Sequence, residues 1–284
     1  MDPQLADAVC VALGASVSAA APVHGGDVAV AFRVELADGR WVFVKTHRNP
    51  PPGFFSTEAA GLTWLGEAGA VDVPTVLACS DDSPALLALS WIERATAVAS
   101  TEEDLGRRLA TLHRVGAPCF GREDRRTTGS RALPNEPTQT WAEFYAINRL
   151  LPLARLADGV LGTSTIDRLV ALADRLESFG GPPEPPARLH GDLWAGNRIV
   201  GAGGRSWLID PAAHGGHREF DLAMMRLFGG FGEACFVAYD EVFPLADGWA
   251  ERVTLHQISP LVVHAIKFGG GYVAAATGAI ERYT

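Results

Sequence analysis

Three oxygen-bearing side chains at fixed spacings could hold a metal ion and activate a hydroxyl group. Asp192 is followed five residues later by Asn197, and Asp210 comes thirteen residues after that, at the end of the apolar run 207–209. Phosphoryl transfer needs a carboxylate that orients the attacking hydroxyl, together with oxygen ligands for Mg²⁺. The catalytic loop of kinases places its base and an asparagine ligand at this D-x-x-x-x-N spacing. The spacing therefore predicts Asp192 as the base and Asn197 and Asp210 as metal ligands.

Each of these residues taken alone has an ordinary structural explanation. An isolated Asp or Asn in a loop is more often a turn former or a helix cap than a catalytic group. The combination of all three, between two short strand-like runs, favours the catalytic interpretation. His190, two residues before Asp192, is expected to hold the loop by hydrogen bonds and not to transfer a proton.

One basic and one acidic side chain in the first sixty residues could anchor phosphates. Lys45 ends the strand-like run 42–45, and Glu58 opens the following helical segment. Kinases bind α- and β-phosphates with such a strand lysine, held by a helix acid. A solvated strand-end lysine and a helix-start acid favoured by the helix dipole are the structural alternatives. The turn Gly25-Gly26 could bring backbone N–H groups to the phosphates, although a glycine pair alone is a weak indication.

The elements that must position these groups change in character near residue 92. Before it, apolar periodicity and turn residues predict helices at 4–13 and 58–68 and strands at 28–36, 41–45, 71–79 and 85–91. After it, we expect helices at 102–113, 141–156, 166–179, 219–240 and 249–283, and a small hairpin of strands 198–200 and 206–209. The fold class is therefore α+β. A β-rich part at 1–92 meets a helical part at 93–284, and a ligand cleft is expected between them.

The composition argues against several classes of partner and compartment. The chain has 284 residues, of which 48% are apolar and 20% charged, as is typical of globular proteins. A formal net charge of −9 disfavours nucleic acid and anionic membranes as partners. The sequence has neither an apolar run of the ~20 residues that span a bilayer nor a secretory signal pattern. Four scattered cysteines without a C-x-x-C spacing indicate neither zinc nor disulfides and fit the cytoplasm.

With these residues assembled, the chain resembles the fructosamine kinase (ketosamine-3-kinase) family, within the wider group of aminoglycoside phosphotransferases and choline kinases. The most specific string is HGDLWAGN at 190–197, with its tryptophan after Asp-Leu and its glycine before the asparagine. Other family strings lie at 106–113, 209–212, 216–224, 227–231 and 268–272. The resemblance covers nearly the whole chain and implies a two-lobed, protein-kinase-like fold. It also implies ATP, Mg²⁺ and transfer of the γ-phosphate to the 3-hydroxyl of a sugar-derived ketoamine, with deglycation as the cellular role.

The resemblance further implies where the nucleotide binds. Segment 88–93, which includes Trp91, Ile92 and Glu93, would be the hinge that meets adenine through backbone groups. The glycine turn departs from the family pattern, because an acidic Asp27 follows Gly25-Gly26 and its contacts with phosphate are left open.

Substrate contacts are assigned by position near the catalytic strings. The candidates are Trp194, His217, Arg218 and, in the polar loop 121–138, Asn135. Trp194 could equally pack in the core. Glu219 and Asp221 match a family motif for which we expect a structural or a substrate-side role.

Two other functions remain open from the sequence. A kinase of the same broad class could phosphorylate an aminoglycoside, choline or another small alcohol. The basic side chains of loop 121–138 argue against an aminoglycoside, for which an acidic loop is expected; they are Arg122, Arg125, Arg126 and Arg131. A catalytically dead nucleotide-binding scaffold is hard to reconcile with the complete set of Lys45, Asp192, Asn197 and Asp210. The chain is expected to act as a monomer or a homodimer.

Overall fold

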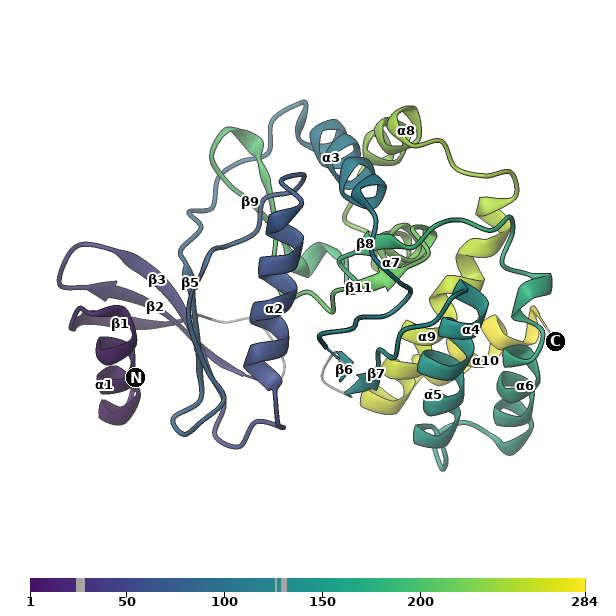
Figure 1. The fold of residues 1–284 in the computed structure, drawn as a ribbon, viewed down its shortest axis with the longest axis horizontal. Coiled ribbons are helices and arrows are strands. Elements are labelled where there is room, and N and C mark those ends of the chain that lie inside the picture. Colours follow the sequence, from purple (N-terminus) through teal and green to yellow (C-terminus); the bar gives the residue numbers. More distant parts are fainter. Residues whose placement is uncertain (24–28, 126, 129–131, 284) are drawn as a thin grey trace.

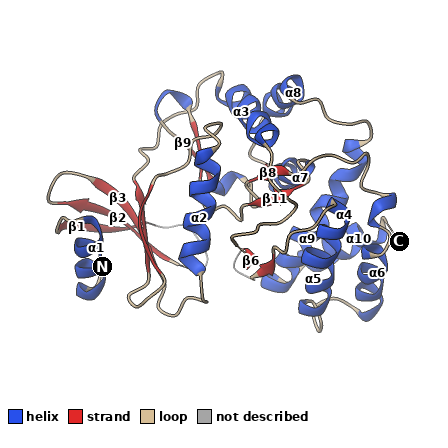
Figure 2. Ribbon diagram, viewed as in Figure 1, coloured by secondary structure: helices blue, strands red, loops and turns tan. Residues whose placement is uncertain are grey.

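The first third of the chain contains an antiparallel sheet with two helices, and helices form most of the remainder (Figure 1, Figure 2). The structure is a computed structural model that describes residues 1–23, 29–125, 127–128 and 132–283. The arrangement confirms the predicted α+β class. Among the described residues, no helix combines the length and the apolar character needed to cross a membrane.

The sheet has the strand order β1-β2-β3-β5-β4. Its strands are β1 (Val17–Val23), β2 (Val30–Leu36), β3 (Trp41–Thr46), β4 (Val76–Ser80) and β5 (Leu86–Ser90). Side chains alternate across a strand, so Val42 and Val44 pack toward α1 (Pro3–Leu13), whereas Phe43 packs toward α2 (Phe54–Glu67). Lys45 shares the face of Phe43 and therefore points to the side covered by α2, which faces the helical part (Figure 1).

Two details of this part differ from expectation. Strand β1 was not predicted, because its small residues are mostly exposed and show no apolar alternation; it is held at the sheet edge by pairing with β2. Helix α2 begins at Phe54, earlier than the expected residue 58. Its start is stabilised by Asp81 of the β4–β5 turn, whose Oδ1 accepts the Phe55 N–H at 2.8 Å. Such a cap comes from a residue distant in sequence, so local patterns cannot show it.

Glycine pairs divide the long helices expected in the second part. Predicted helix 219–240 breaks at Gly229-Gly230 and predicted helix 249–283 breaks at Gly269-Gly270; all four residues have positive φ, between 56° and 86°. The helices there are α3 (Thr101–Val115), α4 (Trp141–Tyr145), α5 (Leu151–Leu156), α6 (Thr163–Ala173), α7 (Glu219–Phe228), α8 (Glu233–Val242), α9 (Trp249–Phe268) and α10 (Gly271–Glu281). A π-helical turn, Ala146–Leu150, joins α4 to α5.

Short hairpins lie between the sheet and the helices and carry the polar segments. Strand β8 (Ala187–Leu189) pairs with β11 (His214–Gly216), and β9 (Arg198–Val200) pairs with β10 (Ser206–Leu208). The second pair confirms the predicted hairpin. A two-residue pair, β6 (Thr127–Thr128) and β7 (Leu133–Pro134), lies within the loop that was expected to be irregular.

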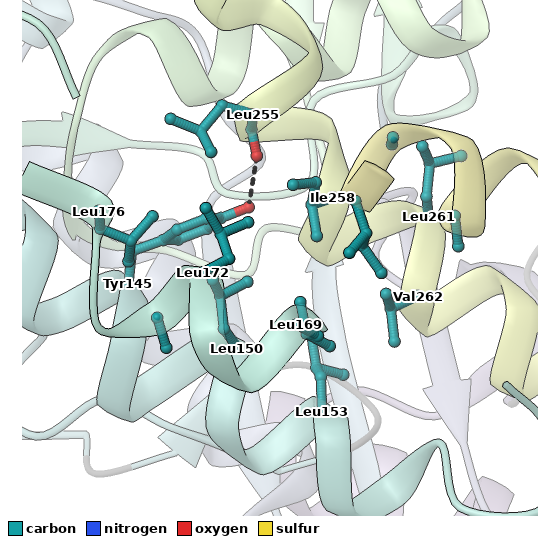
Figure 3. Close-up of a cluster of buried hydrophobic side chains, with 14 of the residues drawn as sticks. Tyr145, Leu150, Leu153, Leu169, Leu172, Leu176, Leu255, Ile258, Leu261 and Val262 are labelled. Atoms are coloured by element: carbon teal, nitrogen blue, oxygen red, sulfur yellow. Dashed lines mark hydrogen bonds between the residues drawn. The ribbon is translucent and has the colours of Figure 1, made fainter. Parts of the chain in front are cut away.

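A large apolar cluster fixes α9 against the helices α4 to α6 (Figure 3). Tyr145 lies fully buried within it, and its hydroxyl donates to the Leu255 carbonyl at 3.0 Å. That bond satisfies a polar atom inside an otherwise apolar core.

Candidate active site

The loop that follows β8 is held in place by a buried carboxylate. Asp221 accepts the backbone N–H of His190 at 2.8 Å and that of Gly191 at 2.9 Å. Gly191 has φ +80°, and a Cβ there would lie 2.2 Å from the Ala212 carbonyl oxygen, so only glycine fits without displacing the backbone. Of the two roles expected for Asp221, the contacts therefore support the structural one. Its carboxylate supports the loop on the side that faces away from solvent.

Asp221 is itself supported by a buried histidine that the sequence reasoning did not single out. His113 Nε2 lies 3.3 Å from Asp221 Oδ2, and His113 Nδ1 lies 2.8 Å from the Tyr239 hydroxyl. Burial alone would raise the pKa of Asp221, but the hydrogen bond from His113 and the nearby histidines hold it below its usual range. The only sequence signal was that His113 ends the family string 106–113.

His190 is placed for the structural role expected of it. Its Nε2 lies 3.0 Å from the Ile209 carbonyl and its Nδ1 lies 3.3 Å from the Asp192 backbone N–H. A neutral ring with its proton on Nε2 satisfies both contacts. Burial lowers the pKa of His190, which favours that neutral form.

The three oxygen-bearing side chains of the predicted catalytic set converge. Asn197 Nδ2 donates to the Asp192 carbonyl at 2.9 Å, to Asp192 Oδ2 at 3.1 Å and, at 3.4 Å, to the Asp210 carbonyl. These bonds use the amide nitrogen and leave Oδ1 to serve as a ligand. Asp210 adopts φ +54°, a conformation uncommon outside glycine and one that often marks functional sites.

Lys45 reaches this group from the sheet. Its ammonium lies 2.8 Å from Glu58 Oε1 on α2 and also forms an ion pair with Asp210 Oδ1. Burial alone would lower the pKa of Lys45, but the two carboxylates outweigh it and raise that pKa, so the ammonium stays charged. A single cation serves two buried carboxylates. The pKa of Asp210 is therefore held low by Lys45 against the effect of its burial, while burial, aided by the charge of Asp210, raises that of Glu58 to about 7.

Asp192 has the electrostatic character of a general base. Burial, reinforced by the negative charges of Asp210 and Asp221, raises the pKa of Asp192 to about 7, against the hydrogen bond from Asn197. A base is most effective when its pKa lies near the working pH. The amide oxygen of Asn197 and the carboxylate of Asp210 are hard oxygen donors of the kind that Mg²⁺ prefers, so the residues present fit that ion.

The expected hinge connects β5 to the helical part. Trp91 Nε1 donates to Glu93 Oε2 at 2.9 Å, and the Arg33 guanidinium lies over the Trp91 ring at 5.0 Å. The Ala95 N–H donates to the Val200 carbonyl at 2.8 Å and ties the connector to β9. Gly25 and Gly26 lie outside the described residues.

Of the substrate candidates, Trp194 alone presents a large exposed surface. Trp194 is 41% exposed, whereas His217, Arg218 and Asn135 are 4%, 3% and 0% exposed. The Trp194 ring covers Gly196, where a Cβ would fall 2.2 Å from ring carbon. Trp194 therefore does not pack in the core, the alternative that its sequence position allowed.

The other three candidates are bound to residues of the protein. Arg218 donates to both carboxylate oxygens of Glu184, at 2.8 and 2.7 Å, and lines a separate cavity of about 590 Å³. Asn135 Oδ1 accepts from Arg149 at 2.8 Å. His217 packs between the rings of Trp141 and His256, at 5.5 and 5.0 Å. These three residues were chosen because they lie near the catalytic segments in sequence, but their side chains contact other residues of the protein. Their expected contact with substrate is therefore not supported.

Glu219 anchors α7 to α9 and does not reach the catalytic group. His217, Glu219 and His256 offer ligand atoms within 4.8 Å of one another, an arrangement that could hold a metal ion. However, Arg252 donates to both carboxylate oxygens of Glu219, at 2.9 and 2.6 Å. A guanidinium bound in this way would repel a cation, so the cluster is best explained as a buried ion pair with two packed histidines.

Comparisons with known proteins identify the family of the chain. A family model described as fructosamine kinase matches residues 1–284. A probable ketoamine kinase of Thermus thermophilus is 37% identical over 271 residues, which cover 92% of this chain and 93% of the relative. The protein-ribulosamine 3-kinase of Arabidopsis thaliana chloroplasts is 31% identical over 267 residues, which cover 92% and 81%.

Solved structures extend the similarity to the fold. A crystal structure of a proposed fructosamine-3-kinase from Thermobifida fusca has a TM-score of 0.91 and 38% identity and covers 100% of this chain and 99% of its own. A choline kinase from Streptococcus pneumoniae has a TM-score of 0.63 and 15% identity, with 98% and 97% covered, which shows a shared fold.

Proposed function

The chain belongs to the fructosamine kinase family, and on that premise we propose that it transfers the γ-phosphoryl group of ATP to the 3-hydroxyl of a sugar-derived ketoamine. The observation that carries this proposal is the convergence of Asp192, Asn197 and Asp210 beneath Lys45. Three of these groups lie on the segments that flank β9 and β10, and the fourth, Lys45, comes from strand β3 of the sheet.

In the proposed reaction, Asp192 orients the attacking hydroxyl and accepts its proton. The 3-oxygen forms a bond to the γ-phosphorus while the bond to the bridging β,γ-oxygen breaks, and ADP leaves with that electron pair. Asn197 and Asp210 would hold Mg²⁺, which supplies positive charge against the phosphate oxygens. Lys45 would leave Asp210 and bind the α- and β-phosphates. Its ion pair with Glu58 would keep the ammonium in place there.

The rest of the nucleotide is assigned by the same reasoning. Adenine would lie against the backbone of Trp91, Ile92 and Glu93, which leads from β5 into the helical part. The Gly25-Gly26 turn is proposed to cover the phosphates.

The product suggests a role in deglycation. A phosphate on C3 is attached to the carbon next to the C2 carbonyl of a ketoamine. When C1 loses a proton, the resulting C1=C2 enaminol can expel the phosphate from the allylic C3 position. The adduct then breaks down and releases the amine. A cytoplasmic location and a monomeric or homodimeric state remain predictions.

A substrate screen tests the function. The protein is incubated with ATP and Mg²⁺ together with ribulose-lysine, fructose-lysine, choline or an aminoglycoside, and ADP formation is followed. We expect turnover with one or both ketoamines, and a phosphorus-coupled NMR spectrum should place the phosphate on C3. Turnover confined to choline or the aminoglycoside, or phosphate on another carbon, would refute the proposal; absence of any turnover would favour a dead scaffold.

A further inference from the structure

A row of aromatic side chains begins in the catalytic loop and continues along the last two helices. Trp194 lies 6.2 Å from Phe228 between ring centroids, and Phe228 lies 4.8 Å from His264. His264 lies 5.5 Å from Phe268 and 5.1 Å from Tyr272, and these last two rings lie 5.9 Å apart. We call these five residues the aromatic shelf.

Glycine pairs allow the chain to bring the residues of the aromatic shelf together. Gly230 allows the segment after α7 to approach the catalytic loop, because a Cβ there would fall 2.4 Å from Ala195 Cβ. Gly269 and Gly270, with φ +64° and +56°, turn the chain between α9 and α10 and bring Tyr272 back against His264. The strings LFGGF and FGGGY thus meet in space, although nearly forty residues separate them in the sequence.

Both ends of the shelf are open to solvent. Trp194 is 41% exposed and Phe268 is 51% exposed. Ligand sites are lined mainly by apolar and aromatic side chains, and a contiguous exposed apolar surface commonly marks such a site.

The shelf ends at a cation on one side and begins beside the catalytic carboxylate on the other. The Lys267 ammonium lies 4.8 Å from the centre of the Phe268 ring. At the other end, Trp194 lies two residues after Asp192, and its backbone N–H donates to the Asp192 carbonyl at 3.2 Å. The shelf and the reacting group therefore share one site.

We propose that the aromatic shelf binds the amine half of the ketoamine, a protonated secondary amine that carries a hydrocarbon chain, while the sugar half lies at Asp192. This inference rests on the proposed phosphorylation of ketoamines. The amine nitrogen is only three bonds from C3, so the group attached to it must leave the catalytic centre close to Trp194. The ammonium is attracted to aromatic faces, and methylene groups lying on Phe268 and Tyr272 remove apolar surface from water.

Two synthetic ribulosamines, made from methylamine and from n-butylamine, test the proposal. They share the sugar and the ammonium and differ by three methylene groups. We expect kcat/KM of the wild-type protein to be about tenfold higher for the butyl compound. Three fully buried methylene groups would give a larger ratio, but a half-exposed surface removes only part of their area from water. Phe268→Ala should reduce the butyl-to-methyl ratio to below about twofold. Val237→Ala, which removes an equally exposed side chain on α8 (52% exposed), should keep the full ratio.

Equal kcat/KM values in the wild-type protein would overturn the proposal, as would a ratio that Phe268→Ala leaves intact. Tyr272→Ala provides a second variant with the same expected loss, should Phe268→Ala fold poorly by circular dichroism. Phosphorylation of choline or an aminoglycoside but of neither ribulosamine would instead refute the proposed function, and the role of the shelf with it. The two failures are therefore distinguishable.

Discussion

Replacing the carboxylate of Asp221 should both destabilise the protein and disable its catalytic loop. Asp221 is 0% exposed and accepts two backbone N–H groups at 2.8 and 2.9 Å, with His113 Nε2 at 3.3 Å. In Asp221→Ala the donors of His190 and Gly191 lose their acceptor, and each buried unsatisfied donor costs about 1–3 kcal/mol. With the loss of the His113 contact, we expect the free energy of unfolding to fall by about 3–5 kcal/mol. The measurement is the midpoint of urea unfolding at constant slope.

A matched control separates burial from hydrogen bonding. Asp240 also accepts a backbone N–H, that of Leu245 at 2.7 Å, but it does so at the surface. Asp240→Ala should lower the free energy of unfolding by about 1 kcal/mol or less, because water can replace the lost acceptor. If Asp221→Ala were no more destabilising than Asp240→Ala, the view of Asp221 as the brace of the catalytic loop would be wrong.

Asp192→Asn should bind nucleotide normally, as measured by calorimetry. Its turnover in steady-state kinetics should be slower by a factor on the order of 10² or more, since a positioned base contributes about that much. Near-normal turnover would contradict the assignment of Asp192 as the base. Asp210→Ala should abolish the Mg²⁺ dependence of nucleotide binding, measured by titration calorimetry, whereas unchanged dependence would place the metal elsewhere. With the pKa of Asp192 raised to about 7, kcat/KM should rise roughly tenfold per pH unit below that value, as the carboxylate ionises, and level off above it; a flat profile would argue against Asp192 as base. Gly191→Ala should impair both stability and turnover, because the new Cβ would lie 2.2 Å from a backbone oxygen. In the control Gly159→Ala, φ is a similar +75° but no atom lies within 4 Å, so only the dihedral strain should appear. Equal losses in the two variants would show that the close contact does not matter.

Local patterns were a reliable guide to elements with a strong apolar period. The strands 41–45 and 85–91 and the hairpin of 198–200 and 206–209 have near counterparts in the structure, because short apolar runs bounded by turn residues are typical of buried strands. Strand β1 carried no such pattern and exists because β2 offers it hydrogen bonds. The helix breaks at 229–230 and 269–270 required attention to glycine pairs, which interrupt apolar periods that otherwise continue.

The candidate catalytic residues could be named from the sequence because phosphoryl transfer restricts both the types and the spacing of the residues that it needs. Asp192, Asn197 and Asp210 lie within twenty residues, so one loop and one hairpin determine most of their geometry. The partners of those residues could not be found in this way. His113 lies more than a hundred residues from Asp221, and only the packing of α3 against α8 and β8 brings the two together.

The sequence by itself therefore determined the chemistry, because a reaction constrains side-chain types and short spacings directly. The tertiary structure alone decided which side chains surround that chemistry. It buried His217, Arg218 and Asn135 among partners of their own and left Trp194 exposed. The physical reason is that direction and burial depend on long-range packing and on the compensation of buried charge, neither of which is written in any local stretch of the chain.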